Sequence, residues 1–169
     1  MFNDKVKEVL NEQINKEFYS AYLYLSMSAF FDEIGLSGFA NWTRVQAQEE
    51  VDHGMIIFDY INAQDSKVIL KQIDTPEVEF ESPLQVFEKV LEHEKLVTSS
   101  IDCIAYMSLE ECDLATKNFI NWYIQEQVEE EKIASDVITK LKLFGDEKAS
   151  LYLIDQELSK REYKKHSYS

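Results

Sequence analysis

Four long stretches of this sequence repeat apolar residues at spacings of three and four, and this pattern restricts the fold more than any other feature. Such spacing places the apolar side chains along one face of an α-helix. The pattern predicts long helices over residues 4–32, 37–64, 83–112 and 114–145, and a short helix over residues 147–160. Only four Gly and two Pro occur in the 169 residues, which also favours helix. The sequence therefore predicts an all-α fold.

The lengths of the connections predict how these helices are arranged. Few residues join the first helix to the second and the third to the fourth, so each pair should form an antiparallel hairpin. Residues 65–82 lose the helical period and contain one of the two prolines, and the second, Pro83, follows directly. Helices of about 28 residues are about 42 Å long, and an extended segment of about 18 residues reaches about 60 Å. The segment can return along the whole bundle, which predicts a four-helix bundle with one long crossover and a short fifth C-terminal helix.

Residues that favour helix starts support these boundaries. Ser37 can cap the second helix, Ser82 followed by Pro83 can start the third, and Asp113 can cap the fourth. The fourth helix is expected to end at Gly145.

Charge and composition narrow the class of protein. With 45% hydrophobic residues, the chain can form one compact domain over residues 1–169. A net charge of −15 disfavours nucleic acid, whose phosphates would repel it, and favours attraction of cations. Only the last stretch, "KREYKKHSYS", is basic, and we expect a frayed, mobile tail from about residue 161.

Targeting signals and cysteine motifs are not evident. No apolar signal-peptide core or membrane-spanning run occurs, so we expect no membrane partner and a cytoplasmic location. Cys103 and Cys112 form no CxxC pair, and we expect them to be reduced, structural thiols.

Six polar residues interrupt the apolar faces of the four long helices near their midpoints. Leu10, Glu17, Tyr24 and Phe31 follow one another at intervals of seven, so Glu17 lies in line with the core. The corresponding residues of the other helices are Glu50, His53, Glu94, Gln127 and Glu130. Because midpoints of equal antiparallel helices meet at one height, we expect these six side chains to converge on one buried point.

Taken one at a time, these residues have an ordinary structural explanation. A single glutamate on such a face is often a surface residue, and a single core histidine is more often hydrogen-bonded than metal-bound. Four glutamates gathered without a counter-charge are different, because burying each anion costs several kcal/mol. No Lys or Arg lies near mid-height on these faces. Two divalent metal ions, with His53 as a neutral ligand, would supply the missing charge, so the set predicts a dinuclear metal site.

The motifs around these residues resemble those of the bacterial non-haem ferritins. They are "NEQINKEFYSAYLYLSMS" around Glu17, "EEVDHG" around Glu50 and His53, "EHEK" around Glu94 and "WYIQEQVEEE" around Gln127 and Glu130. The resemblance covers about residues 2–160, with the motifs in the family's order and spacing. Each motif alone would be a weak signal, but together they are specific.

The resemblance implies a ferritin-like fold and an iron-storage function with ferroxidase activity. Fe(II) would enter a 24-subunit homo-oligomeric cage, be oxidised at a dinuclear centre by dioxygen or peroxide, and be stored as a ferric mineral. By correspondence, Glu17, Glu50 and His53 would bind one iron, and Glu50, Glu94 and Glu130 the second, with Glu50 bridging and Gln127 beside the centre. A possible third iron site would consist of Glu49, Glu126 and Glu129, with Glu130 shared.

Several of these residues could also have a purely structural role. Glu49 lies about 100° around its helix from Glu50, away from the apolar face, and acidic runs such as "EEEK" are usually solvated. Packing is the common role of a core tyrosine such as Tyr24, whereas the resemblance implies an electron donor or hydrogen-bond partner of the centre. Trp122 is expected to pack, although the family has a tryptophan there too.

This sequence differs from the motifs of other families in the same superfamily, which disfavours membership of those families. Symmetric di-iron proteins carry Glu-x-x-His on two helices, but the second copy here is Gln127-x-x-Glu130, unlike bacterioferritins, di-iron oxygenases and manganese catalases. Val51 stands where bacterioferritin has its haem-ligating methionine, so no haem is expected. DNA-protecting mini-ferritins bind iron between subunits and lack this set. His93 and His166 have no evident partners, and the sequence assigns them no role.

Three functions remain compatible with these features. The first is an iron-storage ferritin. The second, a di-iron enzyme of the same fold, needs a substrate cavity beside the metals, and the bulky residues there give no sign of one. The third is a non-catalytic bundle that uses its acidic groups for structure or metal buffering. The sequence indicates neither the oxidant nor the route by which iron reaches the centre.

Overall fold

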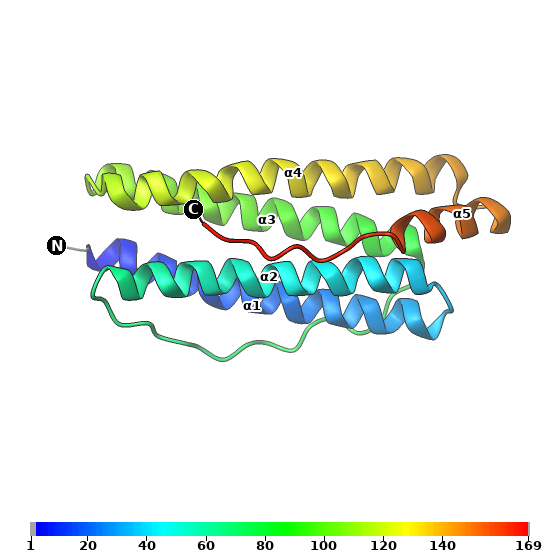
Figure 1. Cartoon of the computed structure of the whole chain (residues 1–169), viewed down its shortest axis with the longest axis horizontal. Helices are drawn as coiled ribbons and strands as arrows, with labels where there is room; N and C mark the ends of the chain where they lie inside the picture. The colour runs from blue at the N-terminus through cyan, green and yellow to red at the C-terminus, as the bar shows by residue number, and fades with distance from the viewer. Residues whose placement is uncertain (1–2, 169) are drawn as a thin grey trace.

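The computed structural model describes residues 3–168, which form five α-helices. They are α1 (Asp4–Glu33), α2 (Ser37–Ala63), α3 (Pro83–Glu110), α4 (Leu114–Phe144) and α5 (Lys148–Leu158). The four long helices lie side by side, and α5 lies at the end of the bundle where α4 finishes (Figure 1). The all-α bundle is confirmed, and each predicted helix matches an observed one to within a few residues.

Local signals explain where the helices begin. Ser82 accepts a hydrogen bond from a backbone N–H of the first turn of α3, and Pro83 occupies that turn. Asp113 caps α4 in the same way. The expected capping by Ser37 is wrong, because Ser37 is already the first helical residue. The capping position is Leu36, whose side chain offers no acceptor.

The long connection between α2 and α3 returns along the bundle beside α1 (Figure 1). Toward the N-terminal end of α1, the backbone N–H of Ile69 donates to Oδ1 of Asn11 at 2.6 Å. Toward the other end, the hydroxyl of Ser26 donates to the backbone carbonyl of Glu77 at 2.6 Å. These contacts hold the segment along the length of α1, and the predicted crossover is confirmed.

The apolar core is divided into two clusters. One contains Met27, Phe31, Phe39, Phe87 and Val137, and the other contains Leu10, Ile14, Ile57, Ile101 and Ile120. All four long helices contribute to both clusters. In each helix, the predicted polar residues lie in the sequence between the two sets. A polar layer therefore crosses the middle of the bundle between two apolar halves.

The C-terminal tail, residues 161–168, lies along the bundle instead of extending away from it. It runs back from α5 between α2 and α4 (Figure 1). The side-chain amide of Asn41 donates to the backbone carbonyl of Arg161 at 3.0 Å, and the hydroxyl of Tyr163 donates to Asp52 at 2.7 Å. The structure thus differs from the expected frayed tail, because polar and acidic side chains of α2 bind this basic segment.

Two further expectations concern the cysteines and membranes. Cys103 and Cys112 are free thiols, as expected, but both are exposed, so the structural role expected for them is wrong. Among residues 3–168, no helix combines the length and the apolar character needed to cross a membrane.

Candidate metal centre

All six predicted residues meet in the polar layer. Glu17 comes from α1, Glu50 and His53 from α2, Glu94 from α3, and Gln127 and Glu130 from α4. Each of these side chains is at most 6% exposed. All six side chains are therefore buried in the middle of the bundle, as predicted, but only three of them form a tight group of ligand atoms.

Three of these residues surround a common point. The ligand atoms of Glu17, Glu50 and His53 all lie within 4.8 Å of one another. Nδ1 of His53 lies 3.5 Å from Oε2 of Glu50 and 4.0 Å from Oε2 of Glu17. The other oxygen of each carboxylate accepts a hydrogen bond from an amide, from Gln13 to Glu17 at 2.7 Å and from Gln46 to Glu50 at 2.8 Å. Two oxygens and one nitrogen are thus left facing inward, a donor set that suits iron or zinc.

One atom in this group has no hydrogen-bond partner among residues 3–168. Oε2 of Glu17 is buried and accepts no hydrogen bond. A buried carboxylate oxygen left unpaired is costly. A cation at this point would satisfy it, so the residues present fit a bound metal ion.

The other half of the layer contains Glu94 and Glu130, with Gln127 and Tyr24 beside them. The amide of Gln127 donates to Oε2 of Glu94 at 3.1 Å, and the hydroxyl of Tyr24 donates to Oε1 of the same carboxylate. Among the described residues, Glu94 and Glu130 do not join a set of ligand atoms as tight as the first. This half is a looser ring of carboxylates, and Tyr24 is a hydrogen-bond partner of the layer as well as a core residue.

The electrostatics of the layer favour protons where no metal is bound. Burial, followed by the charge of Glu50, raises the pKa of Glu17 to about 8 and that of Glu130 to about 7. The same two causes raise the pKa of Glu94 well above its ordinary value.

Burial changes the pKa of a histidine in the opposite direction from the pKa of a glutamate. Burial alone would lower the pKa of His53, but the interactions with Glu50 and Glu17 outweigh it and raise the pKa to about 10. Burial would raise the pKa of Glu50, but its hydrogen bond and ion pair with His53 lower it overall. Without bound metal, these interactions favour an ionised Glu50, a charged His53 and protons on the other carboxyl groups.

The predicted outer acidic residues lie beside the layer and meet the C-terminal tail. Glu49 is buried because the guanidinium of Arg161 covers it and forms an ion pair with its carboxylate. Arg161 also donates to Oε1 of Gln46 at 2.7 Å and lies 4.4 Å from the centre of the Trp42 ring. Sequence position alone placed Glu49 off the core face, and the tail is what buries it.

The outer acidic residues and the tail together line a cavity of about 520 Å³. Its lining includes Glu49, Glu126, Glu129, Glu130, Arg161 and Lys164. Glu126 is half-buried and Glu129 is exposed. The third-site residues therefore line one cavity, in which basic side chains of the tail already face the carboxylates.

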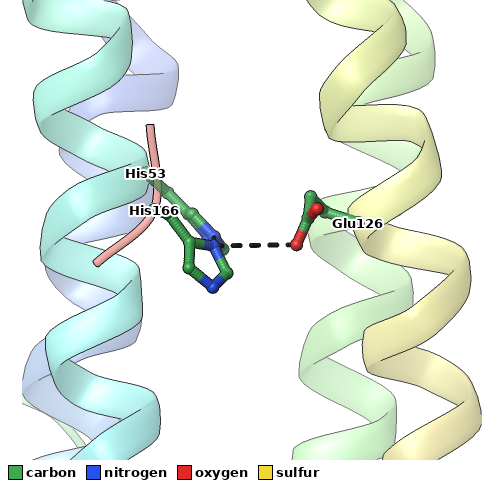
Figure 2. Close-up of side chains that lie close together, drawn as sticks. All are labelled: His53, Glu126 and His166. Carbon is green, nitrogen blue, oxygen red and sulfur yellow. Dashed lines mark hydrogen bonds and ion pairs between the residues drawn. The ribbon is translucent and has the colours of Figure 1, made fainter. Parts of the chain in front are cut away.

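Two histidines that the sequence left without a role have partners in the structure. Nε2 of His93 lies 2.7 Å from the hydroxyl of Ser20. Nδ1 of His166 lies 3.1 Å from Nε2 of His53 and 3.7 Å from Oε2 of Glu126. Figure 2 shows the two imidazoles of His53 and His166 together, facing Glu126 across the space between α2 and α4. No sequence signal predicts this contact, because it depends on where the tail lies.

Trp122 packs as expected. Its ring lies edge-on to His53, with ring centres 5.6 Å apart, and edge-on to the neighbouring Tyr123 at 4.8 Å. It therefore packs against His53 and does not act as a ligand.

Comparisons with family models and with related sequences agree on one family. The Ferritin family model, a ferritin-like domain, matches residues 7–144. A bacterial non-heme ferritin of Campylobacter jejuni is 44% identical over 156 residues, 92% of this chain and 93% of that protein. A probable bacterial non-heme ferritin-like protein of Haemophilus influenzae is 41% identical over 158 residues, 94% of this chain and 96% of that one.

Solved structures agree with the sequence relatives. A structure of an open-pore ferritin from the archaeon Archaeoglobus fulgidus is 50% identical, with a TM-score of 0.94 over 95% of this chain and 98% of that chain. An engineered closed form of the ferritin from the same organism is 49% identical, with a TM-score of 0.95 over 97% and 100%. Because the family match spans the four long helices and these relatives are similar over nearly the whole chain, this protein belongs to the ferritin family.

Proposed function

We propose that this ferritin oxidises Fe(II) at a dinuclear centre within each subunit and stores the product as a ferric mineral inside a hollow homo-oligomeric cage. The observation that carries the proposal is the buried group of Glu17, Glu50 and His53, whose ligand atoms lie within 4.8 Å and include the unpartnered Oε2 of Glu17. A cation at this point would satisfy that oxygen and would be bound by all three ligand atoms.

The two irons would occupy different surroundings. Glu17, Glu50 and His53 would bind the first iron, and Glu50, Glu94 and Glu130 would bind the second, so that Glu50 bridges them. Gln127 and Tyr24 would hold Glu94 through their hydrogen bonds. The bond from Tyr24 supports its role as a hydrogen-bond partner of the centre.

Iron is the substrate of the reaction, and the chain supplies ligands and exchangeable protons. Each of two Fe(II) ions gives up one electron. Dioxygen with two protons would accept the pair to give hydrogen peroxide, or hydrogen peroxide with two protons would give two waters; the proposal includes either oxidant. Metal ligands must lose their protons on binding, so the protons held by Glu17, Glu130 and His53 leave as iron arrives.

A third iron would bind in the cavity beside the centre, at Glu49, Glu126, Glu129 and Glu130. Arg161 is paired with Glu49 in the structure, so this iron would have to displace a guanidinium. We therefore propose that the third site exchanges iron with the centre instead of holding it permanently.

The wider setting is also part of the proposal. Similarity to ferritins over nearly the whole chain supports a cage of 24 subunits and a cytoplasmic location. Val51, in place of the methionine that ligates haem in bacterioferritins, supports a cage without haem.

Replacing the bridging ligand tests the proposed function. Glu50→Ala should abolish the rapid phase of Fe(II) oxidation in stopped-flow absorbance while leaving the helical content intact, because it removes a ligand from both irons. Asp59→Ala, which removes an exposed carboxylate from the same helix, is the matched control and should oxidise Fe(II) like the parent.

Undiminished rapid oxidation by Glu50→Ala would refute the dinuclear assignment. Electron microscopy after aerobic loading with Fe(II) separates the remaining functions. Hollow shells with dense cores support storage, whereas empty shells or isolated subunits would favour a di-iron enzyme or a metal-buffering bundle.

A further inference from the structure

The C-terminal tail reaches the metal centre through the ring of His166. This ring lies on the side of His53 that faces away from the carboxylates, with Nδ1 of His166 at 3.1 Å from Nε2 of His53 (Figure 2). The other nitrogen of His53, Nδ1, faces Glu50 at 3.5 Å. One imidazole therefore connects the centre on one side with the tail on the other.

The two nitrogens of a neutral imidazole have different roles. The nitrogen that binds a metal must present a lone pair, and the hydrogen then lies on the other nitrogen. Metal-binding histidines commonly donate that second N–H to a fixed acceptor, which sets the tautomer and the orientation of the ring. In this chain, the group placed to accept it is Nδ1 of His166.

We propose that His166 is a positioning residue, which accepts the Nε2–H of His53 and holds Nδ1 of His53 toward the first iron. The inference deepens the proposed function and rests on it. It makes the C-terminal tail a functional part of the centre, although the tail lies more than a hundred residues away from His53 in the sequence.

The distances identify His53 as the hydrogen-bond partner of Nδ1 of His166. Nδ1 of His166 is 3.7 Å from Oε2 of Glu126, which is too long for a hydrogen bond, so the shorter contact with His53 engages that nitrogen. A doubly protonated His53 would also donate through Nε2. The same contact therefore serves the centre before and after metal binds.

Other contacts fix the position of His166. Its backbone N–H donates to Oδ2 of Asp52 at 2.9 Å, and the hydroxyl of Tyr163 donates to the same oxygen at 2.7 Å. Asp52 directly precedes His53 on α2, so the tail is attached beside the residue that it positions. The Trp122 ring packs edge-on against both imidazoles, with ring centres 5.6 Å from His53 and 6.0 Å from His166.

The alternative role for His53 and His166 is to bind a separate cation together with Glu126. Ligand atoms of His53, Glu126 and His166 lie within 4.8 Å of one another, a spacing that a cation could bridge. Nε2 of His53 would then present its lone pair to that cation, and Nδ1 would carry the hydrogen and be lost to the first iron. The unpartnered Oε2 of Glu17 lies on the Nδ1 side, 4.0 Å from it, and so favours metal there.

Zn(II) binding to the metal-free, full-length protein tests the inference without relying on oxidation. His166→Ala should weaken Zn(II) binding at the first half-site by about tenfold, the lower end of the effect of removing such a hydrogen bond. His166→Asn offers a side-chain oxygen near the position of Nδ1 and should restore most of the affinity. Lys165→Ala, which removes a neighbouring positive charge of the tail, should bind Zn(II) like the parent. Circular dichroism and gel filtration would confirm that all variants fold and assemble.

Each alternative result has a definite meaning. Parental affinity in His166→Ala, an equal loss in His166→Asn, or an equal loss in Lys165→Ala would overturn the positioning role. A Zn(II) ion bound to Nε2 of His53 between His166 and Glu126 in crystals of the parent would also overturn it. His53→Ala separates this failure from failure of the proposed function: if Zn(II) affinity is unchanged there, the first half-site itself is wrong.

Discussion

Binding of Zn(II) to the metal-free centre at pH 7 is expected to release two to three protons. Without metal, bound protons neutralise part of the charge of the buried carboxylates. The pKa is about 8 for Glu17, about 7 for Glu130 and about 10 for His53. At pH 7, groups with these pKa values together hold about 2.4 protons, all of which must leave when the ligands bind metal. With ordinary pKa values, the same three groups would hold only about 0.2 proton. Glu94, whose pKa is also raised, adds to the difference.

The pH dependence has a definite sign. Raised pKa values mean that the protons are fully present at low pH and leave as the pH rises through 7 to 10. The three groups hold about 2.9 protons at pH 6 and about 1 at pH 9, so proton release should fall as the pH rises. Competition between protons and metal weakens Zn(II) binding over the same range as the pH is lowered.

Isothermal titration calorimetry in buffers of different ionisation enthalpy measures this release directly. The variant Glu50→Ala, which lacks the bridging ligand, provides the background from Zn(II) bound elsewhere on the acidic surface. Asp59→Ala should match the parent. A release below about one proton per centre at pH 7, or one that does not change between pH 6 and pH 9, would refute this reasoning. It would show that protons do not neutralise the carboxylates of the metal-free centre.

Two further predictions concern the unequal half-sites and the outer carboxylates. At sub-saturating Zn(II), crystals should show the half-site of Glu17, Glu50 and His53 filled before that of Glu94 and Glu130, because imidazole adds a nitrogen ligand to the first; equal occupancy at every dose would contradict this. Replacing Glu49 and Glu126 together with Ala should preserve both metals but change the oxygen consumed per iron over repeated Fe(II) additions. Arg161→Ala controls for the lost tail contact, and behaviour identical to the parent would identify these glutamates as a solvated face.

The fold and the inner layer could be predicted because each depends on a repeating local pattern. Glu17 lies in line with Leu10 and Tyr24 at intervals of seven, so its burial follows from helix geometry alone. The crossover followed from its length, since a segment shorter than the helices could not have returned along them. Periodicity and length are both readable from one chain.

The tail could not be predicted in the same way. Nothing in "KREYKKHSYS" repeats, so its position depends on contacts with residues more than a hundred positions earlier, such as Asp52 and Asn41. Basic residues near a chain end usually remain solvated. Here the acidic surface of α2 and the ring of Trp42 bind them. His166 therefore had no visible partner in the sequence, although the structure places it against His53.

The two proposed half-sites differ in which parts of the bundle must be aligned to form them. Glu17, Glu50 and His53 all belong to the α1–α2 hairpin, so one folded hairpin contains the whole first half-site. Glu50, Glu94 and Glu130 come from both hairpins. A small sliding of one hairpin against the other would leave the first set of ligands intact and pull the second apart. Occupancy of the proposed second metal position should therefore depend on the register between the two hairpins, and a partner contact or substitution that shears the bundle should alter it first.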